Sequence, residues 1–548
     1  MRQRFIFICA LFTTSTLASD LNVQSSVEVK GSHQTIQNDD LGVTNDLTTT
    51  EIIPSVSLNY ESKRLNVNWS AKHTHVARDL NEDDRTDNYT EYLYDANFAV
   101  IENLLSLRAR GTLNYLNANA NGFITNDFLL SPDELSKTRS NSYGFVSNIR
   151  GNKYFSASAQ GFYSDTQSEQ RANSAINLSN DTINIQGSLR SGNGIEGLNW
   201  DVNSSFVETD RTNSTDFATR TFSANLSYRL LGDLGIKLST LTEDNQIGDN
   251  SSDFSSLRRF ESYGAGLEYR VNDSRYLAIT YNIYNQPNES SEEDDDSEED
   301  GYVGVEVNWA FSARTKLTGS YGKRFLGETG DVSFVYNTKN FRTRVSYNEE
   351  LTTFSRSISN PVSIGVFVCS NNVIDLGSCF QPNSLAYQLK PGESFAQISG
   401  QNPEINDEIV IRQSFLAAVG FDRRRISVSL DGRYSLTDFL ETNRQQRVWS
   451  VSADSVLAFG AYTDLKTSLR YSNTKQQAQG DVGIDGTSET LEGSIGLSRD
   501  IGQDLTVAGT LLYLEREGDN VGGIGGGALG GANIAERRFT LSLRYQIK

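Results

Sequence analysis

The sequence of 548 residues has little of the material that thiol or metal chemistry needs. It contains 3 cysteines, 3 histidines, 1 methionine and 7 prolines. The histidines are His33, His73 and His75, and no Gly-x-Ser-x-Gly motif supplies a nucleophile for them to activate. His73 and His75 could bind a metal as an alternating pair, but no third ligand is identifiable. We therefore predict no catalytic residue, no cofactor and no metal site, and a protein that is not an enzyme.

Positive charge is also scarce, because 49 lysines and arginines face 69 acidic residues and the net charge is -20. Nucleic acid is therefore not an expected partner, since phosphate binding needs a basic surface. The mean hydropathy of -0.45 is low enough to suggest disorder. However, 24 Tyr, 27 Phe and 4 Trp are spread along the chain and alternate with polar residues. This pattern predicts a folded chain whose elements bury one face only.

A long apolar run is absent, apart from a short one at the N-terminus. Arg2 and Arg4 precede the apolar segment 5–12, and small residues follow up to Ser19. This order predicts a secretory signal peptide over residues 1–19. A membrane anchor is disfavoured, because the apolar core is shorter than the roughly 20 residues that span a bilayer. If the mature chain enters a membrane, it must do so as a closed barrel.

Two-residue alternation of apolar and polar side chains is what the sequence has in abundance. Near the C-terminus, Phe539, Leu541, Leu543, Tyr545 and Ile547 occupy one face and polar residues the other, which indicates a strand. The same pattern recurs at residues 65–72, 105–115, 222–230, 277–283, 303–311 and 426–436. Strands of about ten residues are long for a soluble sandwich, but they fit a tilted crossing of a bilayer.

The connections between these strands are alternately short and long. Short turns such as 61–64, 231–233 and 312–314 alternate with longer polar connections, which we predict to include residues 34–47 and 324–330. Outer-membrane barrels have this layout, with short turns in the periplasm and long loops outside. We therefore predict an all-β fold: a large transmembrane antiparallel β-barrel of about 24 strands over residues 20–548, in the outer membrane of a Gram-negative bacterium. Outer-membrane lipid and the barrel-assembly machinery are its expected partners.

The alternation also predicts which side chains face the lumen. With the apolar rows facing lipid, five arginines line the interior: Arg108, Arg110, Arg229, Arg433 and Arg544. The opposite register is disfavoured, because a charge facing lipid near the midplane costs about 2 to 4 kcal/mol. With inward acids such as Glu306 and Asp431, these arginines either guide an anionic solute or form pairs that stiffen the wall. We favour the second interpretation.

The longest connection, near residues 356–407, contains Cys369 and Cys379 and four of the seven prolines. An oxidising location predicts a disulfide between the two cysteines, with free thiols as the alternative. A loop of this length is expected either to cap the pore or to fold into it. We favour a role in narrowing the pore.

Two other connections have unusual compositions. Residues 289–300 hold nine carboxylates in twelve positions, which indicates a solvated, self-repelling loop tip more than a calcium site, since the ordered spacing and central glycine are missing. The glycine-rich residues 522–531 are not a phosphate cradle, because no Lys-Ser/Thr follows them. The sequence assigns neither segment a role.

Two strand-turn-strand segments carry a resemblance to a known family. A proline-bearing segment, residues 52–60, is followed by the arginine-led residues 63–69, and residues 415–421 lead through the basic turn 422–425 into 426–430. In these features the mature chain resembles the outer-membrane β-barrel family associated with PEP-CTERM/exosortase and exopolysaccharide gene clusters and, more loosely, the type 2 β-barrel porins. The chain departs from the usual barrel ending, since it closes on Ile547-Lys548 without a terminal aromatic residue.

The resemblance implies an outer-membrane component of polysaccharide export or surface assembly, with polysaccharide and periplasmic export proteins as partners and no catalytic residues. A general diffusion porin and a structural or adhesive surface barrel stay open as alternatives. A plug domain is not expected, because strand patterning begins directly after the predicted signal peptide.

Overall fold

A computed structural model of the chain describes most of the residues after the predicted signal peptide. The described residues are 20–40, 42–79, 85–117, 128–129, 132, 135–149, 151, 153–169, 178–192, 194–212, 215–247, 256–285, 300–325, 327–359, 366–370, 379–380, 393–397, 408–478, 486–518 and 533–547. The predicted signal peptide, the glycine-rich segment and all of the acidic run except Asp300 lie outside them.

The described residues form a closed ring of 24 antiparallel strands. The first strands are β1 (Asp20–Asn38), β2 (Val43–Glu61), β3 (Leu65–Asp79), β4 (Arg85–Ile101), β5 (Leu105–Asn117), β6 (Leu135–Ile149), β7 (Phe155–Glu169) and β8 (Leu178–Ser191). The middle strands are β9 (Leu198–Arg211), β10 (Phe217–Leu231), β11 (Leu234–Ile247), β12 (Ser256–Asn272), β13 (Arg275–Asn285), β14 (Asp300–Ser312), β15 (Thr315–Arg324), β16 (Gly327–Asn337) and β17 (Phe341–Thr352). The last strands are β21 (Val410–Arg423), β22 (Ile426–Phe439), β23 (Arg444–Ala458), β24 (Thr463–Ala478), β25 (Gly486–Ile501), β26 (Leu505–Gly518) and β27 (Ile534–Ile547).

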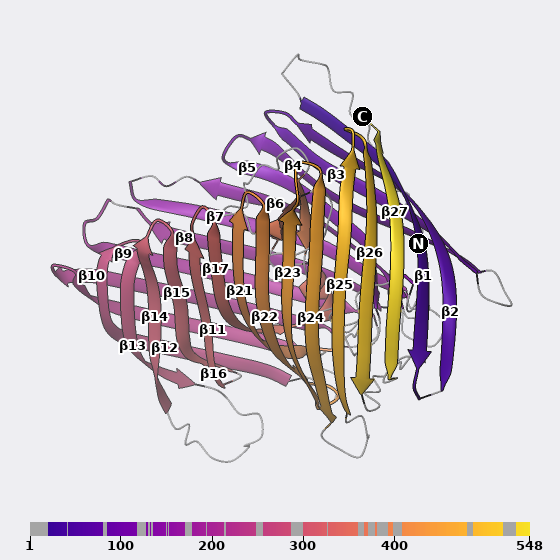
Figure 1. Cartoon of the computed structure of the whole chain (residues 1–548). Helices are drawn as coiled ribbons and strands as arrows, with labels where there is room; N and C mark the ends of the chain where they lie inside the picture. The colour runs from indigo at the N-terminus through magenta and orange to yellow at the C-terminus, as the bar shows by residue number, and fades with distance from the viewer. Residues whose placement is uncertain are drawn as a thin grey trace, which may run out of the picture.

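Each strand pairs with its neighbour along the chain, and β1 closes the ring by pairing with both β2 and β27 (Figure 1). The all-β class, the antiparallel order and the strand number confirm the prediction from the sequence. The predicted absence of a plug domain stays a prediction.

The strands are longer than the hydropathy pattern indicates. The predicted loop 34–47 is wrong, because β1 runs to Asn38 and β2 begins at Val43, and the predicted loop 324–330 shrinks to the two residues between β15 and β16. Apolar alternation stops where a strand leaves the apolar belt, but the backbone ladder continues with polar side chains on both faces. The Thr35 hydroxyl, for example, donates to Asp46 across β1 and β2 at 2.6 Å.

The predicted loop near 356–407 also contains regular structure. The helix α1 (Phe354–Ser359) follows β17, and β18 (Val366–Ser370), β19 (Cys379–Phe380) and β20 (Glu393–Gln397) form a separate three-stranded sheet. Among the described residues, no helix is long and apolar enough to cross a membrane.

The outer face of the ring carries exposed apolar side chains. On β27, Phe539, Leu541, Leu543 and Tyr545 are each between 44% and 55% exposed. Exposed apolar side chains continue around the ring on the other strands and form an apolar belt. A closed ladder satisfies its own backbone groups, and an apolar outer belt suits hydrocarbon. The chain is therefore a transmembrane β-barrel of the outer-membrane type.

The two ends of the barrel differ, and we name them by their connections. The turn end holds the start of β1, the end of β27 and the short turns, and the loop end holds the connections that follow β1, β5 and β17. Inward side chains near the loop end are buried, for example Asn180 and Thr182 on β8. Near the turn end of the same strand, the inward Arg190 is exposed. The lumen is thus open at the turn end and packed at the loop end.

Candidate functional site

The inner wall carries several ion pairs, some between neighbouring strands and some within one strand. The Arg110 guanidinium on β5 lies 2.8 Å from the Asp95 carboxylate on β4, and Arg433 lies 3.1 Å from Asp431, two residues away on β22. The structure does not bring the five predicted arginines together, because they lie on β5, β10, β22 and β27. Arg108, Arg229 and Arg544 form no ion pair with another described residue. Their role in lining a transport path stays a prediction.

Glu306, the other predicted inward acid, belongs to a sharp bend of the wall at β11–β15. It pairs with Lys237 and accepts a hydrogen bond of 2.6 Å from Tyr276. Lys237 lies on β11 and Glu306 on β14, about 14 Å apart on a flat sheet with 4.8 Å between strands. This pair therefore requires a strongly curved wall, and Arg324 on β15 likewise reaches Glu243 on β11.

Glycines on the inner face make this bend possible. A side chain at Gly264 would place its Cβ 1.8 Å from the amide oxygen of Asn282, and one at Gly266 would place it 1.9 Å from the carbonyl oxygen of Ile279. Because both residues lack a Cβ, the Lys237 side chain has room to cross β12 toward Glu306. The ion pairs and the glycines together set the shape of this side of the lumen.

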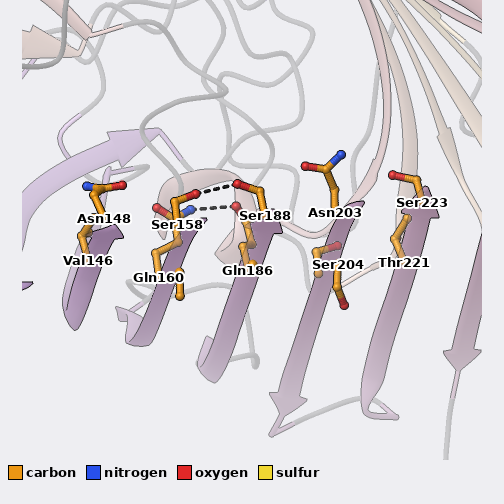
Figure 2. Close-up of a pocket in the computed structure, with 13 residues that line it drawn as sticks. Val146, Asn148, Ser158, Gln160, Gln186, Ser188, Asn203, Ser204, Thr221 and Ser223 are labelled. Atoms are coloured by element: carbon orange, nitrogen blue, oxygen red, sulfur yellow. Dashed lines mark hydrogen bonds between the residues drawn. The ribbon is translucent and has the colours of Figure 1, made fainter. Parts of the chain in front are cut away.

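The middle of the wall of β6–β10 is different, because the inward side chains there are uncharged. Charged inward residues lie on either side of it: Arg211 toward the loop end, and Asp201, Arg190 and Arg229 toward the turn end. Figure 2 shows them in rows across consecutive strands, pointing away from the wall. We call this surface the neutral facet, and it consists of Asn148, Ser158, Gln160, Gln186, Ser188, Asn203, Ser205, Thr221 and Ser223. With Val146 it lines a shallow open pocket of about 430 Å³.

Side chains of the neutral facet bond to one another across strands. The hydroxyls of Ser158 and Ser188 lie 2.6 Å apart, and the Gln160 amide donates to the Gln186 carbonyl oxygen at 2.7 Å (Figure 2). The Gln160 and Gln186 amides keep both donor and acceptor capacity for a ligand. Of the two serine hydroxyls, the one that donates keeps acceptor capacity only, and the one that accepts keeps its donor. The surface therefore offers many neutral hydrogen-bonding groups of similar strength. Beside it lies the Asp201 carboxylate, which accepts a hydrogen bond of 3.0 Å from Asn203.

Helix α1 lies at the loop end of the neutral facet, inside the barrel. Thr353 begins the helix, since its hydroxyl accepts the backbone N–H of Arg356 at 3.3 Å. Ser355 accepts a hydrogen bond of 3.2 Å from the Asn180 side chain on β8, and Phe354 packs against Leu178. The chain leaves β17 and returns against β6, β7 and β8, far around the ring.

Arg356 is the main anchor of this helix. Its Nε donates to the Thr209 hydroxyl at 2.8 Å, its Nη1 to the Thr219 hydroxyl at 3.1 Å, and its Nη2 to the carbonyl oxygens of Val207 and Phe217 at 3.0 and 2.7 Å. The guanidinium carbon also lies 3.9 Å from the centre of the Phe217 ring. Burial, together with the nearby charge of Arg211, lowers the pKa of Arg356 to about 9, so the side chain is still a cation at neutral pH.

The sequence pattern identified neither the neutral facet nor Arg356. The facet residues are unremarkable on each strand, and only the register places them side by side. A signal was present in the inward row Asn148, Ser158, Ser188, Asn203 and Ser223, which has no charge on five successive strands.

Other predicted residues lie apart from this site. The backbone places Cys369 directly opposite Cys379 in the β18–β19 pair, a spacing that suits a disulfide. His73 and His75 face outward and bond to Thr90 and Asn88 on β4 at 2.8 and 2.9 Å. The disulfide itself stays a prediction.

Comparison with known proteins identifies no family for the chain. No protein-family model and no curated protein sequence matches it. Among solved structures, it is similar to the siderophore receptor PirA from Acinetobacter baumannii, with 9% identity, a TM-score of 0.42, and coverage of 96% of this chain and 80% of the receptor. It is also similar to OpdO from Pseudomonas aeruginosa, with 10% identity, a TM-score of 0.31, and coverage of 96% and 97%. A third similar structure is OccAB3 from A. baumannii, with 8% identity, a TM-score of 0.32, and coverage of 96% and 100%.

Proposed function

We propose that the barrel is an outer-membrane channel for an uncharged, hydroxyl-rich polymer, and that it supports exopolysaccharide export or surface assembly. The observation that carries the proposal is the neutral facet on β6–β10. The turn end would face the periplasm and receive the polymer, and the loop end would face outward, as in other barrels of this type.

The chemistry of the neutral facet suits a sugar chain. Sugar hydroxyls can form hydrogen bonds with serine, asparagine and glutamine side chains. Each such hydrogen bond contributes a net free energy of only about 0.5 to 1.5 kcal/mol. A transported chain must bind well enough to enter and weakly enough to leave. Many equivalent weak contacts meet both needs, whereas a row of unpaired charges would hold a charged ligand or repel it.

The resemblance to barrels of exopolysaccharide systems points to the same substrate class. The charge elsewhere on the wall also fits, because pairs such as Arg110–Asp95 and Arg433–Asp431 already satisfy each other. Such pairs shape the wall without selecting an ion.

A clean deletion strain with a plasmid-borne copy of the gene tests the proposal. Loss of surface polysaccharide with periplasmic accumulation is the expected result, and unchanged polysaccharide would contradict export. A site variant sharpens the test. Ser158→Val with Ser188→Val removes a hydroxyl pair of the neutral facet and is expected to reduce surface polymer. The matched control is Ser468→Val with Ser494→Val, which removes a serine pair at 2.7 Å on β24 and β25.

A general diffusion porin is the second candidate, and the self-paired charges of the wall favour it. A porin predicts that the deletion strain keeps its polymer but takes up small hydrophilic solutes more slowly. The same strains therefore separate the two functions.

A further inference from the structure

We infer that α1 is a latched gate at the loop end of the neutral facet, and that Arg356 is its latch. This inference rests on the proposed function, because it describes how passage along the facet is controlled. In the state seen here the gate is closed. Releasing Arg356 from β9 and β10 would remove the strongest attachment of α1 to the wall, so that the helix could move and widen the path.

The docking site of Arg356 is closely fitted to its guanidinium group. Four hydrogen bonds, to two threonine hydroxyls and two backbone carbonyls, hold one guanidinium group, and the Phe217 ring covers its face. Arg356 is only 8% exposed, and the two threonines are 147 and 137 residues away in sequence. A surface loop does not need such a receptor, so the site holds α1 in one place.

Side chains of α1 form the hydrogen bonds that attach it to the wall. Strands of the barrel are joined by continuous backbone ladders, but within the described part of the chain no backbone–backbone hydrogen bond joins α1 to the wall. Arg356 supplies four of the bonds to the wall and Ser355 supplies another, with Asn180. Losing them leaves the barrel ladder intact, which is what a movable element requires.

The closed state also contains a repulsion that opposes it. Arg211 lies close enough to Arg356 for its charge to act on it, and Arg211 is itself held by Glu441 at 2.8 Å. Two neighbouring cations in a buried setting repel each other. The receptor of Arg356 must overcome that repulsion, so weakening the receptor is expected to favour release.

The test is single-channel conductance of the full-length barrel in planar bilayers. We expect a low open probability for the wild type and a rise of about tenfold or more for Arg356→Ala, the size expected when a charge-assisted hydrogen bond is lost. The control Arg314→Ala removes the same charge from an exposed turn and is expected to behave as the wild type.

A disulfide tether tests the same gate without removing Arg356. Ser355→Cys with Asn180→Cys, in a chain with Cys369→Ser and Cys379→Ser, replaces a contact of 3.2 Å between α1 and β8. Under oxidation the channel should stay closed, and reduction should restore wild-type openings. Gel mobility before and after heating reports that each variant is folded.

Equal open probability of Arg356→Ala and the wild type would overturn the latch, and so would a tether whose oxidation changes nothing. The proposed function is judged separately, by the polymer of the deletion strain. Loss of polymer with a failed latch would remove only the gate, whereas unchanged polymer would remove the proposed function.

Discussion

The ion pair between Glu243 and Arg324 gives the sharpest quantitative prediction about the barrel. The Arg324 Nε and Nη2 each lie 2.8 Å from a carboxylate oxygen of Glu243, which also accepts a hydrogen bond from Asn245. Glu243 is fully buried, and the Arg324 side chain is 33% exposed. The pair joins β11 to β15 across the bend, so we expect Glu243→Gln to destabilise the fold.

The expected size follows from burial. Breaking a buried ion pair by removing one charge costs about 3 to 5 kcal/mol. Because solvent screens part of the Arg324 charge, the lower value of about 3 kcal/mol is the appropriate estimate. Neutralising both partners, as in Glu243→Gln with Arg324→Gln, should recover most of the loss, because no unpaired charge is left. The exposed Lys63–Glu102 pair, at 2.9 Å, is the matched control, and its removal should leave the free energy of unfolding nearly unchanged, because solvent screens both charges.

The assay is urea unfolding of the barrel in lipid vesicles, followed by gel mobility and tryptophan fluorescence. We expect the midpoint to fall clearly for Glu243→Gln, to recover in the double variant, and to stay unchanged for Glu102→Gln. Equal shifts for Glu243→Gln and Glu102→Gln would refute the reasoning that the buried pair holds the bend.

Three further predictions concern the belt, the bend and the cysteines. Leu226→Arg, in the middle of the apolar row of β10, should cost about 2 to 4 kcal/mol, whereas Leu231→Arg at the end of the strand should cost about 0 to 1, as measured by the same unfolding assay. Gly266→Ala should lower the folded yield, because its Cβ would collide with the Ile279 carbonyl, while Gly420→Ala, with open space around its Cβ, should fold normally. Cys369 and Cys379 should resist alkylation until a reductant is added, and labelling of both without reductant would show free thiols.

The strands could be predicted where they cross the apolar belt, and the short turns could be predicted where the alternation stops between two such strands. Within the belt, lipid on one side and water on the other force a two-residue period, as in Phe539 to Ile547. Beyond the belt both faces of a strand are polar, so the sequence signal ends although the ladder continues. This is why β1 and β2 are longer than the prediction, which assigned residues 34–47 to a loop.

The candidate site could not be predicted from the hydropathy pattern, for a different reason. Arg356 lies in a polar segment that reads as a loop, and its partners on β9 and β10 come from a distant part of the chain. The bend at β11–β15 likewise depends on pairs formed across several strands, and Gly264 and Gly266 look ordinary until the register is known. Periodicity reports which face a residue occupies, and it does not report which strands curve toward each other.

Cysteine accessibility at two adjacent positions of β8 tests the central claim most directly, namely that the neutral facet lines a water-filled path. Ser188→Cys lies on the facet, and Leu189→Cys lies in the exposed apolar belt of the outer face. Both are made in a chain with Cys369→Ser and Cys379→Ser, inserted in membrane fragments open on both sides. A membrane-impermeant maleimide should label Ser188→Cys and leave Leu189→Cys unmodified. Labelling of Leu189→Cys with protection of Ser188→Cys would contradict the account.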